Sequence, residues 1–400
     1  MKRNTLFLIL TLMAFTSINA QNKPYITKVY DFMPAPGQFV NDAPMVDEPI
    51  SKDSVLRLVE EMLCGYEKSN GKAVVDPGLI SLGSYGGYVV FGFDHPVVNV
   101  RDSFDIQIIG NAIQGDATTS AGGSSEPGIV MVSRDENGNG IPDDPWYELA
   151  GSEYNNPRTQ KGFKITYYRP DENKIPVPDP NDPFHVIVDM EYIRWTCNSV
   201  DSLQEGYVRK NSFHNQSYWP RWIDSDEITF EGNKLPCNAV DESGDGSYWI
   251  QHFYDWGYVD NRPDWFYGYK KKTFRDYMNL GFKIDWAVDD EGNHVHLRQI
   301  DFVKVYNGIL QDCGRLGETS TEVCGAFDLH PDAEPEPDPM PEVGDVNNDN
   351  SVNAADVTAL YRFILNGDDT FISTSDVNED GSVNAADVTA VYKIILGNER

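Results

Sequence analysis

Two segments near the C-terminus carry oxygen-bearing side chains at the spacing of a calcium-binding loop. Each places Asp or Asn at positions 1, 3, 5, 9 and 12 of a loop. Ca²⁺ takes about six to eight oxygen ligands, and side chains at these offsets can wrap around one ion. The sequence therefore predicts two calcium ions, one held by Asp345, Asn347, Asp349, Asn353 and Asp356, and the other by Asp376, Asn378, Asp380, Asn384 and Asp387.

The sixth position differs between the two loops. Gly381 occupies it in the second loop, where the chain must turn sharply, and Asn350 occupies it in the first. Asn adopts the left-handed conformation less readily than Gly, so we expect the first loop to close with weaker metal affinity. The alternative, a pair of ordinary acidic turns, does not explain why the whole pattern occurs twice.

A third segment repeats the same spacing well before the C-terminus. Its oxygen side chains occupy positions 1, 3, 5 and 9, with Gly140 at position 6. Because Asn-Gly is also typical of a β-hairpin, a plain turn is the alternative interpretation. We predict a third, structural calcium ion held by Asp135, Asn137, Asn139 and Asp143.

Apolar residues at helical spacing follow each C-terminal loop, as in Val357, Leu360 and Ile364. Each unit is therefore expected to be a loop followed by one helix. Residues 344–397 closely resemble a type I dockerin, the calcium-dependent module that attaches secreted polysaccharide-degrading proteins to a cohesin partner. The resemblance implies that calcium binding and folding are coupled. It also implies a cohesin-like partner, contacted in either of two orientations through matching alanines near the helix starts: Ala354, Ala355, Ala385 and Ala386.

The ends of the chain have their own signatures. Residues 1–20 have a basic start, an apolar stretch and a small-residue cleavage site, as in a secretory signal peptide. No apolar run approaches the length of a membrane span. Residues 331–343 alternate Pro with acids and are expected to form an extended linker. We therefore predict an exported protein, secreted or associated with the cell surface, with a large domain over 21–330 and a dockerin over 344–400.

Charge and cysteine content narrow the function classes. The net charge of −31 argues against binding to nucleic acid, whose phosphates require clusters of Lys and Arg. Five cysteines leave at least one free thiol, and their spacings fit no zinc pattern. Cys313 and Cys324 are the best candidates for a local disulfide, with buried free thiols as the alternative.

The large domain is expected to be mainly β. Short β-rich runs such as 87–93, 128–133 and 163–168 lie between turn residues, and one amphipathic helix is predicted over 51–64. We predict a jelly-roll-like antiparallel β-sandwich, with residues 171–222 as an insertion that caps one end. Residues 81–94, 125–135 and 300–306 resemble Bacteroides-type cell-surface proteins with jelly-roll domains similar to carbohydrate-binding modules. Some of those proteins accompany cobamide (vitamin B12) acquisition systems.

Two aromatic-rich stretches, 213–222 and 248–269, are candidates for ligand binding. Flat rings beside polar side chains suit a sugar, and they also suit a corrin ring, although packing of large loops is the alternative. The ligand-binding candidates are Tyr218, Trp219, Trp222, Trp249, Trp256 and Trp265.

Enzyme signatures are sparse. The chain contains no G-x-S-x-G, HExxH or Walker motif, and carboxylate pairs carry little information in so acidic a sequence. We predict a non-catalytic, calcium-dependent protein that binds glycan. The alternatives are a glycoside hydrolase acting on polysaccharide and a surface cobamide-binding protein.

Overall fold

The computed structural model describes residues 22–64, 66–67, 73–74, 78–114, 122–199, 203–263, 281–335, 343–347, 351–366, 375–378 and 380–397. The chain divides into two compact units, residues 1–333 and 334–400. We call them the β unit and the loop–helix unit. Within the described residues, no helix has the length and apolar character needed to cross a membrane. The segment predicted as a signal peptide and residues 336–342 of the predicted linker lie outside the described residues.

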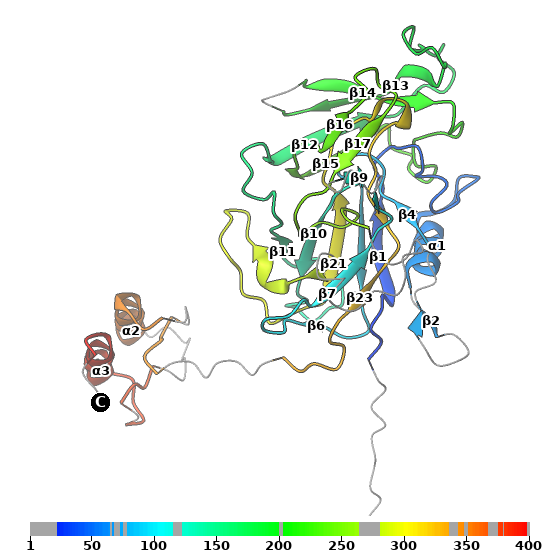
Figure 1. Cartoon of the computed structure of the whole chain (residues 1–400). Coiled ribbons are helices and arrows are strands. Elements are labelled where there is room, and N and C mark those ends of the chain that lie inside the picture. The colour runs from blue at the N-terminus through cyan, green and yellow to red at the C-terminus, as the bar shows by residue number, and fades with distance from the viewer. Residues whose placement is uncertain are drawn as a thin grey trace, which may run out of the picture. The chain divides into compact units, whose positions relative to one another are not determined.

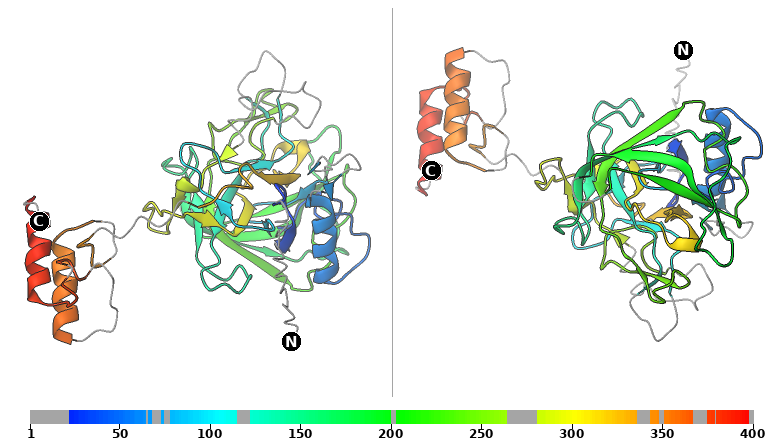
Figure 2. Two further views of the ribbon diagram at one scale, coloured as in Figure 1. Left: turned by 90° about the horizontal axis from the view of Figure 1, so that it is seen from below. Right: turned by 90° about the horizontal axis from the view of Figure 1, so that it is seen from above.

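The β unit is built of small antiparallel sheets arranged in a ring that resembles a four-bladed propeller (Figures 1 and 2). The largest sheet places sequence-distant strands side by side, since Val303 pairs with both Phe91 and Val132. Its strands, in spatial order, are β1 (Lys28–Met33), β5 (Tyr88–Gly92), β21 (Phe302–Asn307), β10 (Gly128–Ser133), β11 (Trp146–Leu149) and β19 (Ala287–Val288).

A four-stranded sheet lies at one end of the β unit, at the top of Figure 1. Phe163, Ile165 and Tyr167 alternate with outward-facing residues along its strand β12, as expected where one face is buried. Their rings and side chains pack on Tyr85, whose ring meets Phe163 edge-on at 4.9 Å. In spatial order the strands are β14 (Glu205–Asn211), β13 (Ile187–Cys197), β12 (Gln160–Tyr168) and β15 (Glu227–Lys234).

The remaining described strands form smaller sheets. One contains β16 (Ala239–Asp241), β17 (Trp249–His252), β9 (Gly122–Ser124) and β8 (Ile113–Gln114), and another β18 (Gly281–Phe282), β7 (Ile106–Ile109) and β23 (Gly325–Asp328). Three pairs complete the set: β2 (Tyr66–Glu67) with β3 (Ala73–Val74), β20 (Gln299–Ile300) with β6 (Val97–Val98), and β22 (Glu322–Val323) with β4 (Ile80–Ser81).

Helix α1 (Lys52–Leu63) lies beside β1 and buries Val55, Val59 and Leu63, which share one helical face (Figure 1). The Ser54 N–H donates to Ser51 Oγ at 3.3 Å, so Ser51 caps the start of the helix. Short 3₁₀ turns are η3 (Ile284–Trp286) and η4 (Gly314–Leu316).

Two expectations for the β unit were wrong. Most described strands are too short and belong to too many separate sheets for a two-sheet jelly roll. The predicted insertion over 171–222 instead supplies β13 and β14, which pair with β12 as part of the core. The antiparallel, mainly β character is confirmed.

None of the five cysteines, all of which lie within the described residues, forms a disulfide. The Cys313 and Cys324 side chains are separately buried. Cys324 Sγ–H donates to the Gly110 carbonyl at 3.5 Å, whereas Cys313 Sγ lies 3.8 Å from Thr319 Oγ1. The expected local disulfide is therefore absent, and the alternative of buried free thiols holds for this pair.

The loop–helix unit contains α2 (Ala354–Asn366) and α3 (Ala385–Ile395), which pack against each other. Matching apolar positions from both repeats build its small core, since Val357 and Leu360 of α2 meet Val388 and Val391 of α3. Val346 and Val377, at the second position of each loop, complete the buried cluster.

Candidate calcium loops and ligand cavities

The second C-terminal loop folds around its own oxygen atoms. Asp376 accepts hydrogen bonds from the Asp380 N–H (3.1 Å) and the Gly381 N–H (2.8 Å). The Asp380 N–H also donates to Asn378 Oδ1, and Asp380 Oδ1 accepts from the Ser382 N–H. Gly381 has φ = +86°, the left-handed conformation predicted for position 6. The backbone is therefore curled as a cation loop requires, with side-chain oxygens directed inwards.

The Asp at position 12 joins each loop to its helix. Asp387 is fully buried and accepts from the Asn378 N–H (3.1 Å) and the Asn384 N–H (2.8 Å). Asn384 in turn caps α3 by accepting from the Ala386 N–H at 2.9 Å. Asp387 thus closes the loop and begins the helix.

The first loop repeats this arrangement through Asp356. Its Oδ1 accepts from the Val346 N–H (2.8 Å) and the Asn347 N–H (3.1 Å), and its Oδ2 accepts from the Asn353 N–H (2.8 Å). Asp345 and Asp356 are both almost completely buried. Buried carboxylates are costly unless a cation or several donors offset their charge, so the site chemistry fits a calcium ion. Asp349 and Asn350 lie outside the described residues.

The two helices expose equivalent surfaces. Ala354, Ala355, Ala385 and Ala386 are all exposed at the helix starts. Further along, Tyr361 and Leu365 on α2 correspond to Tyr392 on α3 and to Leu396, which directly follows α3, and all four are exposed. The repeat thus presents two copies of one small apolar face.

Comparison with protein families identifies this unit. Residues 343–396 match the family described as the Dockerin type I domain, so the C-terminal unit is a type I dockerin domain. Dockerins of this type bind calcium and dock to cohesin, for example in cellulosome assembly, and proteins that carry them are extracellular. The preceding region remains unassigned. The search of curated proteins found no match.

The third predicted loop, between β10 and β11, has the same backbone geometry as the second dockerin loop. Asp135 accepts from the Asn139 N–H (3.0 Å) and the Gly140 N–H (2.8 Å), and Gly140 has φ = +70°. Asn137 Oδ1 accepts from the Asn139 N–H, and Asn139 Oδ1 from the Ile141 N–H. Asp143 accepts from both Asn side-chain amides. The four predicted ligands are therefore gathered in one loop.

A related loop in the β unit was not predicted as a calcium loop. Asp241 accepts from the Gly246 N–H at 2.7 Å, and Asp245 Oδ1 accepts from the Ser247 N–H at 3.0 Å. Hydrogen bonds from Ser243 and Ser247, respectively, lower the pKa of Asp241 and Asp245. The sequence pattern that could have predicted this loop is D-x-S-x-D-G, in which Ser243 replaces the usual Asp or Asn at position 3.

The aromatic candidates are divided between core and surface. Tyr218 and Trp219 are buried in the core beneath the four-stranded sheet, so their rings are packing elements. Trp222 stacks on Phe32 at 5.9 Å, and Trp249 donates to the Gly246 carbonyl. Trp256 is 40% exposed and rests against Trp286. Trp265 lies outside the described residues.

A polar cavity of about 400 Å³ is lined by residues of β11, β12, β15 and β21. Glu148 on its wall is buried, and burial raises its pKa to about 7. Lys161 is partly desolvated, which lowers its pKa to about 8. The Asn233 side-chain amide donates to Glu148, while Trp146 and Tyr154 contribute aromatic surface. Glu148 is close in sequence to the loop that begins at Asp135, but its side chain lines this cavity.

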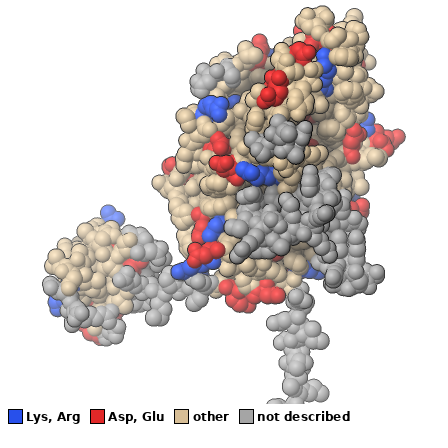
Figure 3. Space-filling model, in the orientation of Figure 1, with Lys and Arg blue, Asp and Glu red and all other residues tan. Residues whose placement is uncertain are grey.

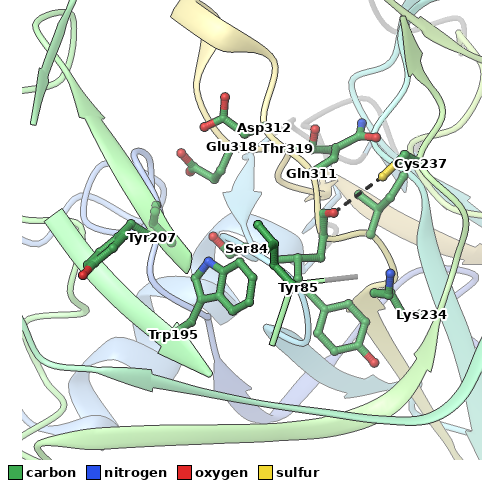
Figure 4. A pocket seen from close by; sticks show the side chains of 14 residues that line it. Ser84, Tyr85, Trp195, Tyr207, Lys234, Cys237, Gln311, Asp312, Glu318 and Thr319 are labelled. Carbon is green, nitrogen blue, oxygen red and sulfur yellow. Dashed lines mark hydrogen bonds between the residues drawn. The ribbon is translucent and has the colours of Figure 1, made fainter. Parts of the chain in front are cut away.

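A second, more apolar cavity of about 310 Å³ is lined by residues that sequence reasoning did not identify. Figure 4 shows Trp195 of β13 and Tyr207 of β14 on one side, with Lys234 and Cys237 on the other. These aromatics occur singly in strands rather than in aromatic-rich stretches. Their contribution to one cavity depends on strand pairing that local sequence does not reveal.

Proposed function

We propose that this chain is a secreted protein with two binding functions. Its dockerin docks to a cohesin-like partner in a calcium-dependent manner, and its β unit binds a glycan. The observation that carries the docking proposal is the pair of equivalent exposed faces on α2 and α3. Each face begins at the helix start next to a calcium loop, so metal binding would order the surface that the partner contacts.

The repeated face supports two docking orientations. Ala355, Tyr361 and Leu365 on α2 have counterparts in the same order in the second repeat: Ala386 and Tyr392 on α3, and Leu396 at its C-terminal cap. Small alanines allow a partner to approach closely, and the exposed Tyr and Leu side chains supply apolar contact area. A rotation that exchanges the two helices would present the same chemistry to the partner.

The docking proposal is tested with Ala355→Asp and Ala386→Asp, singly and together, by calorimetry against a type I cohesin in calcium and in chelator. We expect each single variant to retain binding through the other face. The double variant and the chelated protein should show no measurable binding. Ile175→Asp, at a residue 88% exposed on the β unit, is the matched control. Full binding by the double variant would refute the proposed face.

The polar cavity is the candidate glycan site. Trp146 and Tyr154 offer apolar ring surface, while Glu148, Asn233 and Lys161 offer acceptors and donors for sugar hydroxyls. The third loop supports this site because it connects β10 to β11, the strand that carries Trp146 and Glu148. An ion there would stabilise one wall of the cavity.

The glycan proposal is tested by calorimetric titration of the full chain, in calcium, with a panel of polysaccharides. Glu148→Gln should weaken binding roughly tenfold, because an amide NH₂ replaces one of the carboxyl oxygens that can accept from sugar hydroxyls. Glu205→Gln, at an exposed carboxylate on β14, should leave affinity unchanged. The panel also includes cyanocobalamin. Saturable binding heat with cyanocobalamin and with no polysaccharide would identify the ligand as a cobamide rather than a glycan.

Glycoside hydrolysis is the second candidate function. Because its pKa is raised to about 7, Glu148 can hold a proton near neutral pH, as a general acid must. Glu231, Asp289 and Asp290 line the same cavity and could provide the second carboxylate. Release of reducing sugar that is lost in Glu148→Gln would establish this activity. Binding without product would favour the non-catalytic role.

A further inference from the structure

Three carboxylates from distant parts of the chain meet inside the β unit. Glu126 lies just before β10, and Glu322 is the first residue of β22. Asp260 follows Val259, which forms an isolated β-bridge with Gly128. One oxygen from each lies within 4.8 Å of the others. Asp260 and Glu322 are 3% and 4% exposed. Like charges this close in a buried place repel one another unless a cation or protons neutralise them.

The backbone positions Asp260 closely. Its φ of +55° is in the left-handed region, and the Asn111 N–H donates to its Oδ1 at 2.7 Å. The Glu322 N–H donates to its Oδ2 at 3.0 Å. A Cβ on Gly110 would lie 2.6 Å from Asp260 atoms, so only Gly permits this approach. The carboxylate is thus held at a defined position beside Glu322.

A fourth carboxylate, which lacks a hydrogen-bond partner on one oxygen within the described part of the chain, lines a cavity together with two members of this cluster. Glu318 is 7% exposed, and its Oε1 accepts from the Gln38 N–H at 2.6 Å. Its Oε2 is buried and finds no hydrogen-bond partner among the residues that the structure describes. Glu318, Glu126 and Glu322 all line a cavity of about 310 Å³. An unpartnered buried oxygen is unusual in a folded protein and indicates a missing ligand.

The neutral groups around the cluster also provide oxygen. The Asn111 side-chain amide lies 3.1 Å from Asp260 Oδ1 and 3.2 Å from Glu322 Oε2. It can give its oxygen to a cation or its NH₂ to the carboxylates. Gln251 and Thr319 line the cavity as well. An all-oxygen set suits a hard divalent cation such as Ca²⁺ rather than a metal that prefers nitrogen or sulfur.

We propose that Glu126, Asp260 and Glu322, together with Glu318, form a buried divalent-cation site that binds Ca²⁺ and fastens three distant segments of the β unit. The site is separate from the two dockerin loops and from the loop at Asp135. Burial raises the pKa of Glu126 to about 7 and the pKa values of Asp260 and Glu322 well above the ordinary range, and at Asp260 and Glu322 the neighbouring carboxylates add to this effect.

The test counts calcium ions by equilibrium dialysis on the full chain carrying Asp345→Ala and Asp376→Ala, so that dockerin sites do not contribute. Thermal unfolding followed by tryptophan fluorescence is the second measurement. All eight tryptophans precede residue 287, so this signal reports on the β unit. In this background we expect calcium to raise the unfolding midpoint.

Glu322→Gln in the same background should lose one bound ion. It should also lose most of the calcium-dependent rise in midpoint while becoming more stable than its parent in chelator, because one repelling charge is gone. Glu318→Gln is a second variant should Glu322→Gln fail to fold. Exposed Glu205→Gln is the control and should change neither measurement.

Two results would overturn the proposal. One is an unchanged ion count in both Glu322→Gln and Glu318→Gln. The other is a parent whose midpoint is the same in calcium and in chelator, which would mean that protons alone neutralise the cluster.

Discussion

Burial of the Glu148 side chain is the main cause of its raised pKa. Glu148 lies on β11, and its acidity is altered chiefly by loss of water and only secondarily by Lys161 and Asn233, which act in the opposite direction. Lys161 is affected by the same loss of water, and its Nζ lies over the Tyr154 ring. A carboxylic acid and an amine with pKa values near neutrality can exchange roles in hydrogen bonding to a ligand.

The raised pKa of Glu148 predicts a pH dependence of stability. Folded protein keeps the proton up to about pH 7, whereas the unfolded chain releases it near the ordinary value of 4.5. This contribution, about 3 kcal/mol, is therefore fully present below that ordinary value and is lost as pH rises through 7. Glu148→Gln stays neutral, so its unfolding free energy should fall less between pH 5 and pH 8.

Urea unfolding followed by tryptophan fluorescence measures this difference. Glu231→Gln, at an exposed carboxylate on the same cavity, should retain the parental pH slope. Identical slopes in the parent and Glu148→Gln would contradict the assignment.

At the level of elements, the loop and the helix of each dockerin repeat form one structural unit. Asp387 accepts backbone N–H groups from both the loop and the residue that caps α3. Closure of the loop proposed to bind calcium and initiation of the helix therefore depend on the same carboxylate. A helix of this length is marginal by itself, so it needs the cap and the shared core.

Asp387→Asn should weaken calcium affinity roughly tenfold or more and also reduce helix content, because it removes a charge and an acceptor near the helix start. Asp380→Asn makes the same charge change at a position that, among the described residues of the loop, accepts from the Ser382 N–H and not from a residue at the helix start. It should weaken calcium binding with little loss of helix. Calorimetry and far-ultraviolet circular dichroism separate these effects, and equal helix loss in both variants would contradict the shared role.

Local pattern was sufficient for some elements and not for others. The helix predicted over 51–64 is observed at Lys52–Leu63, and the run 128–133 is β10. Fixed offsets within a short loop were sufficient to predict that Asp135, Asn137, Asn139 and Asp143 lie together, because their contacts are local. The pairing of β5 with β21 could not be predicted, because it joins segments about two hundred residues apart. The carboxylate cluster was missed for the same reason, and the burial of Tyr218 depends on packing beyond its own stretch.

At the level of the whole molecule, many acidic side chains are concentrated in particular turns and clusters. On the face shown in Figure 3, Lys and Arg side chains are scattered among Asp and Glu. The structure gathers many acids into turns and clusters suited to cations, in both units. We therefore expect the free protein in chelator to behave as a self-repelling polyanion, and added calcium to act mainly at these places.

The two matching faces of the dockerin also have a statistical consequence. A module with two equivalent ways to occupy one receptor gains a degeneracy of two in the bound state, worth about 0.4 kcal/mol at room temperature. The larger benefit is geometric, because a neighbour that obstructs one orientation leaves the other open. Duplication of a short loop and helix would thus allow the attached β unit to take either of two orientations on the partner, according to which one its neighbours leave free.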